Sequence, residues 1–552
     1  MRRTILFILI LLGSLAQAQK LKKEDKQLLA NLQKHVEYLA SDALEGRRTG
    51  TAGEKKAAAY IAEQFKSIGL LPKGTQEYLQ PFEIAEGNQI NPTTHLIVDE
   101  RNLVAEKEFI PLHFSANASL EALPSLALQE AGSPWFWDVK DLLQAHSGNP
   151  HFDVYEAIRN KAEEVQKKGA TALFVYNSGS TDDGITFLAK EHSEPASIPV
   201  VYLTKEAMKK YFNDVSATYD IKLKTSIGPK SRNGTNVIGY IDNGASTTVV
   251  MGAHFDHLGY GEDNNSLFRT GEKQVHNGAD DNASGTAALL ELALLLKNSK
   301  LTNNNYLFIA FSGEELGLYG SKYFVEHPTV DISKVNFMIN MDMVGRLNDS
   351  TRTVTVGGFG TSPAWAQAYN LSGRQKLYSG DLLFRYDSSG TGPSDHTSFY
   401  LKNIPVLFYF TGLHSDYHRP TDDFNKVNYS GELQVVKHIY SLLEWQNKMG
   451  NRLAFAKTRE TQMGTGTRFS VTLGIMPDYT FSGAGVRVDG VSENRPAQKA
   501  GLQAGDVIVQ LGDYPVSSVE TYMQALNKFK KGDKTMVQYN RGAEKRSAAV
   551  EF

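Results

Sequence analysis

The chain has 552 residues, of which 41% are hydrophobic and 22% charged, and its formal net charge is -3. This length suggests three or four domains, each large enough to bury its own core. The weakly negative charge provides no broad positive field, so we expect no nucleic-acid partner. The absence of cysteine excludes a disulfide framework, thiolate metal ligands and a lipid-modified cysteine.

The first residues have the composition of an export signal. They contain an arginine pair, a short apolar core and an Ala-Gln-Ala site before Gln19. We therefore predict a secretory signal peptide over residues 1–18. The apolar core is too short for a membrane span, and no later apolar run approaches the roughly 20 residues that a span needs. We expect a protein exported to the bacterial periplasm or to the outside, without a membrane span.

Two regions follow before the strands that carry the candidate site. Residues 20–111 contain the segment EYLASDALEGRRTGTAGEKKAAAYIAEQFKSIGL. Residues 112–223 form an additional stretch. In it, KAEEVQKKGATALFVYNSG predicts an amphipathic helix, a glycine and a strand, and SIPVVYLTKEAMKKYF predicts a second strand and helix. We predict that this stretch is an inserted α/β domain.

The next region, residues 224–449, contains four short apolar runs: TTVVMGA, YLFIAFS, VNFMIN and PVLFYF. Each run is rich in β-branched or aromatic residues and does not alternate, which suits strands of a sheet covered on both faces. The run ASGTAALLELALLLKN has apolar residues at helix spacing. We therefore predict an α/β fold with a mostly parallel mixed sheet and helices on both faces.

Histidines and acidic residues lie next to these predicted elements. Three of the runs are followed within one residue by a histidine or an acidic residue. The fourth run leads into a loop that carries a histidine, and a further acidic residue lies at the start of the predicted helix. The residues are His254, Asp281, Glu314, Glu315, Asp342 and His418. Ligands of an open parallel sheet gather outside the carboxyl ends of its strands, so we expect these six side chains to converge.

The ligand types narrow the choice of metal. Imidazole and carboxylate groups without thiolate suit Zn²⁺, with Co²⁺ or Mn²⁺ as substitutes, whereas an all-oxygen set would indicate Ca²⁺ or Mg²⁺. One carboxylate can bridge two ions about 4 Å apart, and the other ligands then divide evenly between them. One of the adjacent glutamates would remain as a general base.

These segments resemble the zinc-dependent aminopeptidase family that includes bacterial leucyl aminopeptidases and vacuolar aminopeptidase Y. The resemblance covers roughly Asn233 to Met449 together with the segment Glu37–Leu70. It implies a discontinuous dizinc peptidase domain of the zinc-exopeptidase type, formed by residues 20–111 and 224–449. The inserted stretch is similar to the protease-associated domain that often interrupts this family, which implies a wall or lid over the cleft.

The resemblance also implies a role for each candidate residue. His254 and Asp342 would bind one zinc, Glu315 and His418 the other, and Asp281 would bridge the two ions. Glu314 would be the general base, and Asp256 would be the carboxylate that orients His254. Four other nearby histidines match no ligand position, so we expect them at the surface or in support of the ligands; they are His257, His276, His396 and His414.

One departure from the family concerns the transition-state stabiliser. Some members place a tyrosine in the loop before a Ser-Asp-His segment, whereas this chain has SSGTGPSDHTSF there. Neither Thr391 nor Ser394 has the reach of a tyrosine, and Tyr386 is the upstream candidate in its place. The metals themselves can supply much of this stabilisation.

The C-terminal region is predicted to be a separate small domain. A polar, Gly- and Thr-containing stretch at residues 450–467 suits a linker. Residues 468–552 resemble a bacterial PDZ domain, with Leu473–Met476 as the carboxylate-binding loop and Val519–Phe529 as the groove-lining helix. A C-terminal peptide is the expected ligand of such a groove, and the chain's own end at Phe552 is one candidate.

The expected function is hydrolysis of the N-terminal residues of peptides, through a metal-bridged water and Glu314 as the base. Two alternatives stay open. A carboxypeptidase would need a cationic clamp for the substrate carboxylate, and Arg346, Arg385 and Arg419 lie near the site segments. A non-catalytic peptide-binding scaffold is the other alternative, although every ligand position is filled. A glutaminyl cyclase, which is a relative of this family, is disfavoured because glutaminyl cyclases work with a single zinc.

Overall fold

The computed structural model describes most of the chain after the predicted signal peptide. The described residues are 22–147, 152–189, 191, 193–263, 265–268, 272–369, 377–458, 471–477, 484–491, 495–503, 505–517, 519–542 and 544–552. The predicted signal peptide and residues 459–467 of the predicted linker lie outside them. Within the described part, no helix has the length and apolar character needed to cross a membrane.

Contacts divide the chain into two compact units. One comprises Met1–Phe82 with Asn233–Phe552, and the other comprises Glu83–Arg232. The stretch predicted as an insert, residues 112–223, lies within the second unit.

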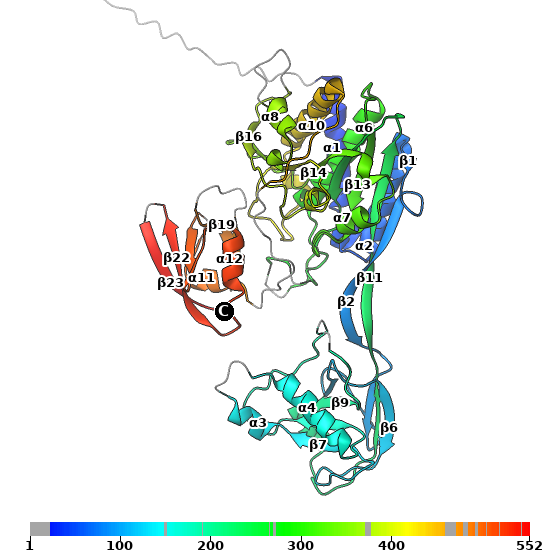
Figure 1. Ribbon diagram of the computed structural model, residues 1–552, viewed down its shortest axis with the longest axis vertical. Helices are drawn as coiled ribbons and strands as arrows, with labels where there is room; N and C mark the ends of the chain where they lie inside the picture. The colour runs from blue at the N-terminus through cyan, green and yellow to red at the C-terminus, as the bar shows by residue number, and fades with distance from the viewer. Residues whose placement is uncertain are drawn as a thin grey trace, which may run out of the picture. The chain divides into compact units, whose positions relative to one another are not determined.

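A nine-stranded mixed sheet forms the centre of the first unit (Figure 1). Its strand order is β1-β11-β13-β12-β14-β17-β15-β16, and β2 also pairs with β11. The strands are β1 (Leu71–Pro72), β2 (Leu79–Ile90), β11 (Ile227–Ile241), β12 (Thr248–His254), β13 (Asn305–Phe311), β14 (Val335–Met341), β15 (Thr353–Gly357), β16 (Leu383–Tyr386) and β17 (Val406–Phe410). The neighbours β13, β12, β14 and β17 run parallel to one another. These are the four predicted strands, so the predicted fold class is confirmed.

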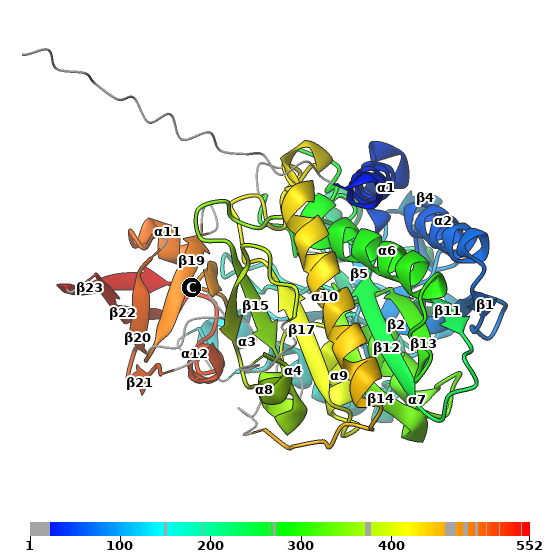
Figure 2. The same ribbon diagram turned by 90° about the horizontal axis from the view of Figure 1, so that it is seen from above.

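Helices cover both faces of this sheet, and Figure 2 shows α6 and α10 side by side on one of them. Within β12, Val249 and Met251 belong to one hydrophobic core and Val250 to another. The first core includes residues of α1 (Lys23–Leu39), α2 (Ala52–Ile68), α6 (Gly285–Lys297), α8 (Pro363–Tyr369) and α10 (Tyr429–Met449). The second includes residues of α7 (Tyr319–Glu326) and α9 (His396–Tyr400). Burial on both faces explains why the strands read as continuous apolar runs.

The second unit contains two four-stranded sheets. One has the order β4-β3-β10-β6 and consists of β3 (His95–Val98), β4 (Arg101–Leu103), β6 (Ala118–Ala122) and β10 (Ile221–Thr225). The other has the order β5-β9-β8-β7 and consists of β5 (Phe109–Pro111), β7 (Trp135–Asp138), β8 (Leu173–Tyr176) and β9 (Val200–Leu203). Three helices accompany them, α3 (Lys140–Ala145), α4 (Val154–Lys167) and α5 (Lys205–Tyr211). The predicted order of helix, strand, strand and helix appears as α4, β8, β9 and α5.

The C-terminal region has a hydrophobic core formed only by residues between Val471 and Phe552. Its main sheet has the order β18-β19-β20-β22-β23, and β21 pairs with β20. Its elements are β18 (Ile475–Pro477), β19 (Val486–Val491), α11 (Pro496–Lys499), β20 (Val507–Leu511), β21 (Tyr514–Pro515), α12 (Val519–Leu526), β22 (Lys534–Arg541) and β23 (Glu544–Glu551).

The chain's own end is part of this sheet. Strand β23 pairs with β22 along its length. The backbone N–H of Phe552 donates to the carbonyl of Asp533, and the N–H of Gly532 donates to the carbonyl of Phe552. The end of the chain is therefore a structural strand, and the hypothesis that it serves as a free ligand of its own groove is wrong.

Candidate metal centre

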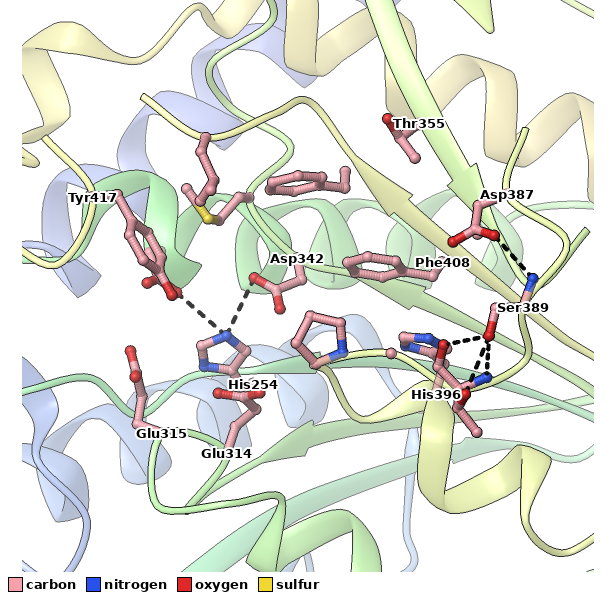
Figure 3. Close-up of a pocket in the computed structure, with 18 of the residues that line it drawn as sticks. His254, Glu314, Glu315, Asp342, Thr355, Asp387, Ser389, His396, Phe408 and Tyr417 are labelled. Carbon is pink, nitrogen blue, oxygen red and sulfur yellow. Dashed lines mark hydrogen bonds and ion pairs between the residues drawn. The ribbon is translucent and has the colours of Figure 1, made fainter. Parts of the chain in front are cut away.

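The six predicted site residues line one pocket at the carboxyl ends of the parallel strands (Figure 3). His254 is the last residue of β12, Asp342 follows β14 directly, and Glu314 and Glu315 follow β13 after a short turn. His418 lies in the loop after β17. Asp281 lies in the helical turn Ala279–Ser284, immediately before α6. Parallel neighbours end at the same edge of the sheet, so residues far apart in sequence meet there.

One donor group is centred on His254. Its Nε2 atom lies 3.4 Å from Oδ1 of Asp281 and 3.3 Å from Oδ1 of Asp342. Its Nδ1 atom lies 3.2 Å from the backbone carbonyl of Asp256. A carbonyl only accepts, so Nδ1 carries the hydrogen and the neutral ring turns its Nε2 lone pair toward two carboxylates. Facing acceptors repel each other unless a cation lies between them, which is the arrangement of a metal-binding histidine.

A second donor group repeats this arrangement around His418. Its Nε2 atom lies 3.3 Å from Oδ2 of Asp281 and 3.2 Å from Oε2 of Glu315. Its Nδ1 atom lies 2.9 Å from the backbone carbonyl of Asn265, which fixes the same tautomer. Asp281 thus presents one oxygen to each group. Imidazole and carboxylate donors in this geometry fit zinc.

His257 lies at the same site. It is buried, and its Nδ1 atom lies 2.8 Å from Oε1 of Glu315. Donor atoms of His257, Asp281 and Glu315 lie within 4.8 Å of one another. A ring that donates its N–H to Glu315 supports a ligand rather than acting as one. The sequence predicts His257 at the surface or in support of the ligands, but it does not identify this partner.

Asp256 connects the site to the segment before α2. Its carboxylate accepts hydrogen bonds from the backbone N–H of Glu314, at 3.1 Å, and from the hydroxyl of Thr49, at 2.9 Å. The Nδ1 atom of His254 lies 3.8 Å from this carboxylate and closer to the Asp256 carbonyl. Burial raises the pKa of Asp256 to about 6. The carboxylate therefore anchors the backbone of Glu314, and the carbonyl orients the imidazole.

The two adjacent glutamates have opposite electrostatic environments. Burial raises the pKa of Glu314 well above its usual value, and the carboxylates of Asp342 and Glu315 raise it further. Burial alone would also raise the pKa of Glu315, but the neighbouring imidazoles of His418 and His257 lower it to about 2. Such a separation of pKa values is the pattern expected where one carboxyl group transfers a proton and its neighbour stays ionised.

Arg47 holds the loops that carry the ligands. It is completely buried, and its guanidinium donates to four backbone carbonyls. These belong to Phe255 at 2.7 Å, Asn277 at 2.7 Å, Gly278 at 2.9 Å and Leu39. Burial lowers the pKa of Arg47 to about 10, so it stays charged at neutral pH. This side chain thus fixes the loop after His254 to the loop before Asp281, a function that sequence reasoning did not assign.

Asp422 holds the other side of the Asp281 loop. It is fully buried, and its Oδ2 atom accepts from the backbone N–H groups of Asp280, at 2.9 Å, and Asp281, at 3.1 Å. His414 Nε2 lies 3.2 Å from the Asp280 carboxylate. These contacts place His414 in support of the loop that carries Asp281. The sequence assigns no role to Asp422.

The other histidine and tyrosine side chains near the site differ in whether they line the pocket. His276 is buried beside Ser266, with 2.6 Å between Nε2 and the hydroxyl oxygen. Tyr386 packs on Phe359, with ring centroids 4.3 Å apart, and does not line the pocket. Tyr417 does line it, and its ring stacks on His418 at 3.9 Å. Tyr417, rather than Tyr386, is therefore placed to interact with a substrate.

Fold and site together define a metal-dependent hydrolase of the α/β class. A model described as Peptidase family M28 matches residues 236–443, and a PDZ domain model matches residues 459–552. The chain therefore contains a Peptidase family M28 domain followed by a PDZ domain, which confirms both resemblances.

Similar proteins carry related names. The aminopeptidase YwaD of Bacillus subtilis is 24% identical over 431 residues, which cover 74% of this chain and 84% of that protein. An aminopeptidase of Pseudomonas aeruginosa is 32% identical over 196 residues, and the match spans 34% of this chain and 32% of that protein. A solved zinc aminopeptidase from Bacillus subtilis is similar with a TM-score of 0.41 and 21% identity, over 76% of this chain and 94% of that structure.

Proposed function

We propose that this protein is a zinc-dependent aminopeptidase that holds two zinc ions and removes N-terminal residues from peptides. The observation that carries the proposal is the lack of a cationic clamp in the described lining of the pocket that contains the proposed ligands. Besides those ligands and Glu314, the lining includes the carboxylate of Asp387, and among the described lining residues there is no lysine or arginine. Such a pocket offers an acidic group to the ammonium of a free N-terminus and no cationic partner to a C-terminal carboxylate.

Each residue has a distinct part in the proposed reaction. His254 and Asp342 would hold one zinc ion, His418 and Glu315 the other, and Asp281 both. Zinc at such a site lowers the pKa of a coordinated water and polarises the scissile carbonyl. Glu314, with its raised pKa, is suited to take a proton from the attacking water and to give it to the leaving amine. Asp256 keeps Glu314 in place through its backbone N–H.

The geometry argues against the carboxypeptidase alternative. Of the three arginines considered for a carboxylate clamp, none lines the pocket. Arg346 donates to Asp416 at 3.0 Å, which occupies its guanidinium with a partner of the protein's own. The scaffold alternative would leave a buried cluster of acidic residues and histidines without a use, and burying such groups unpaired is costly.

The other parts of the chain are proposed to serve substrate access. The inserted stretch of residues 112–223, within the second unit, would act as a protease-associated domain that limits the cleft to small or extended peptides. The open edge of β18, beside Leu473–Met476, would bind the C-terminus of a peptide by strand addition. The proposed signal peptide would direct the protein to the bacterial periplasm or the outside.

The test combines metal analysis with hydrolysis of amino-acid p-nitroanilides by the mature protein, before and after chelation. Two zinc equivalents and chelator-sensitive release of the chromophore are expected. Peptides with an acetylated N-terminus provide the control, because they lack the ammonium group and should not be hydrolysed. Hydrolysis of acetylated peptides with loss of their C-terminal residue would favour the carboxypeptidase instead, and failure to bind zinc would favour the scaffold.

A further inference from the structure

Away from the proposed metal ligands, the pocket is lined by aromatic side chains and by the imidazole of His396 (Figure 3). Phe408 and Phe410 lie on β17 with their rings nearly parallel, 5.9 Å apart and inclined by 12°. The ring of His396 stacks on Phe408 at 4.6 Å with an interplanar angle of 8°. Met343 and Leu413 also line the pocket. These surfaces suit a flat or apolar side chain.

His396 is unusual because its hydrogen-bonding capacity is unused. The residue is 1% exposed, and neither ring nitrogen has a hydrogen-bond partner among the described residues. Burial lowers the pKa of His396 to about 3, so the ring is neutral at physiological pH and offers one N–H donor and one acceptor. Buried polar atoms without partners are costly, and a ligand that reaches them removes this cost.

Gly392, which has no side chain, lies beside the edge of this ring. A Cβ atom at this position would lie 2.8 Å from Nε2 of His396 and 2.9 Å from its Cε1 atom. Thr397 holds Gly392 in place, since its hydroxyl oxygen accepts from the Gly392 N–H at 2.8 Å and its hydroxyl donates to the Gly392 carbonyl at 2.7 Å. Gly392 and His396 both line the pocket. Any larger residue at position 392 would fill the space in front of the nitrogen.

We propose that His396 determines specificity by hydrogen bonding to the polar end of an aromatic N-terminal side chain, so that tyrosine is preferred to phenylalanine. This inference rests on the proposed aminopeptidase function. The aromatic wall binds the ring, and His396 binds the hydroxyl that distinguishes the two residues. Asp387 also lines the pocket and disfavours acidic side chains.

The experiment compares kcat/KM for the p-nitroanilides of tyrosine and phenylalanine, using the full-length, zinc-loaded protein. One additional hydrogen bond predicts a preference for tyrosine of roughly tenfold. His396→Leu should bring this ratio close to one, whatever its effect on the absolute rates. Gly392→Ala, which keeps the imidazole but fills the space before it, should also lower the ratio. His327→Leu, at an exposed histidine of the same unit, should keep the wild-type ratio.

Melting temperature and zinc content verify that each variant is folded, and Gly392→Ala carries the test if His396→Leu does not fold. A wild-type ratio near one, or a ratio that His396→Leu leaves unchanged, would overturn the inference. In that case, hydrolysis of the leucine and phenylalanine substrates would leave the proposed function standing. Inactivity toward every p-nitroanilide would overturn both.

Discussion

Glu314 is the proposed general base and not a proposed metal ligand, so its replacement should separate catalysis from metal binding. Its pKa is raised by burial and by neighbouring carboxylates, and its backbone N–H is held by Asp256. Glu314→Gln should therefore lower kcat by about 10²–10⁴-fold, the range typical of a lost general base. The zinc content should stay at the wild-type value. Glu315→Gln is the matched comparison, because the adjacent residue is a proposed ligand and its loss should lower the zinc content as well.

Two histidines lie at the second proposed metal position, and the surroundings of their Nε2 atoms distinguish them. Nε2 of His418 lies beside carboxylate oxygens of Asp281 and Glu315. Among the described residues Nε2 of His257 has no partner, and its Nδ1 donates to Glu315. We expect His418→Ala to lose one tightly bound zinc. His257→Ala should keep both ions with about 10–100-fold weaker affinity, as for other residues that orient a ligand. Competition with a chromophoric chelator measures both quantities, and a lost zinc in His257→Ala alone would reverse the assignment.

The candidate site could be predicted where the signal is local. His254 ends an apolar run and Asp342 follows one, and the geometry of a parallel sheet then brings them together. The contacts of His257 and Asp422 could not be predicted, because they depend on how two loops fold back on each other. The same reason explains why Tyr417, rather than Tyr386, lines the pocket.

At the scale of elements, the short helix Asp42–Arg47 ties the N-terminal part of the chain to the ligand loops. Arg47→Lys should lower the melting temperature of the metal-free protein by roughly 5–10 °C, because one ammonium group cannot donate to several carbonyls as the planar guanidinium group does. The zinc affinity should fall as well.

Arg48→Lys is the matched control for this substitution. Arg48 forms a partly exposed pair with Asp263, at 2.7 and 2.9 Å. Exposed pairs contribute about 1 kcal/mol or less, so we expect a shift of roughly 2 °C. Equal shifts for both variants, measured by differential scanning calorimetry, would contradict the clamping function of Arg47.

Helix α10 carries a buried carboxyl group that should make stability depend on pH. Glu432 is fully buried, and neither carboxyl oxygen has a hydrogen-bond partner among the described residues. Burial raises its pKa well above the usual value, and Asp280 and Glu291 raise it further. The folded protein thus keeps a proton that the unfolded chain loses. The contribution is complete below the usual glutamate pKa and is lost as the pH rises toward the folded value, at about 1.4 kcal/mol per pH unit.

Glu432→Gln should remove this dependence. Its melting temperature should exceed that of the wild-type protein by a margin that grows from pH 5 to pH 9. Glu444→Gln, in the same helix but partly exposed, should follow the wild-type curve. A margin that stays constant with pH would show that the Glu432 carboxyl is ionised in the folded protein.

The elements themselves were largely predictable. The four central strands and α6 follow from apolar runs whose length and residue types match buried strands and a helix. The end of the chain was not predictable in the same way, because Val550 and Phe552 read equally well as an apolar ligand and as a strand. Pairing with the preceding strand β22 decides between these two possibilities in favour of a strand.

At the scale of the whole molecule, the C-terminal domain should be removable without loss of the peptidase site. Its hydrophobic core contains only residues after position 470, whereas the site residues belong to the M28 region. The segment before it packs on the peptidase region: Thr458 bonds to the hydroxyl of Tyr400 on α9, and the N–H of Ala456 donates to the carbonyl of Thr361 at 2.7 Å. A chain that ends at Thr458 keeps these contacts.

Removal of the C-terminal domain then separates catalysis from the proposed tethering of substrates. The shortened chain should hydrolyse p-nitroanilides with kcat/KM within about twofold of the full chain. For peptides long enough to reach both sites, kcat/KM should fall by more, about tenfold, because binding at one site raises the effective concentration at the other. The same peptides with an amidated C-terminus are the control, since they lack the carboxylate that a PDZ groove captures. If amidated and free peptides respond equally to the truncation, the domain does not tether substrates through their C-termini. If p-nitroanilide hydrolysis falls as well, the domain supports the peptidase fold itself.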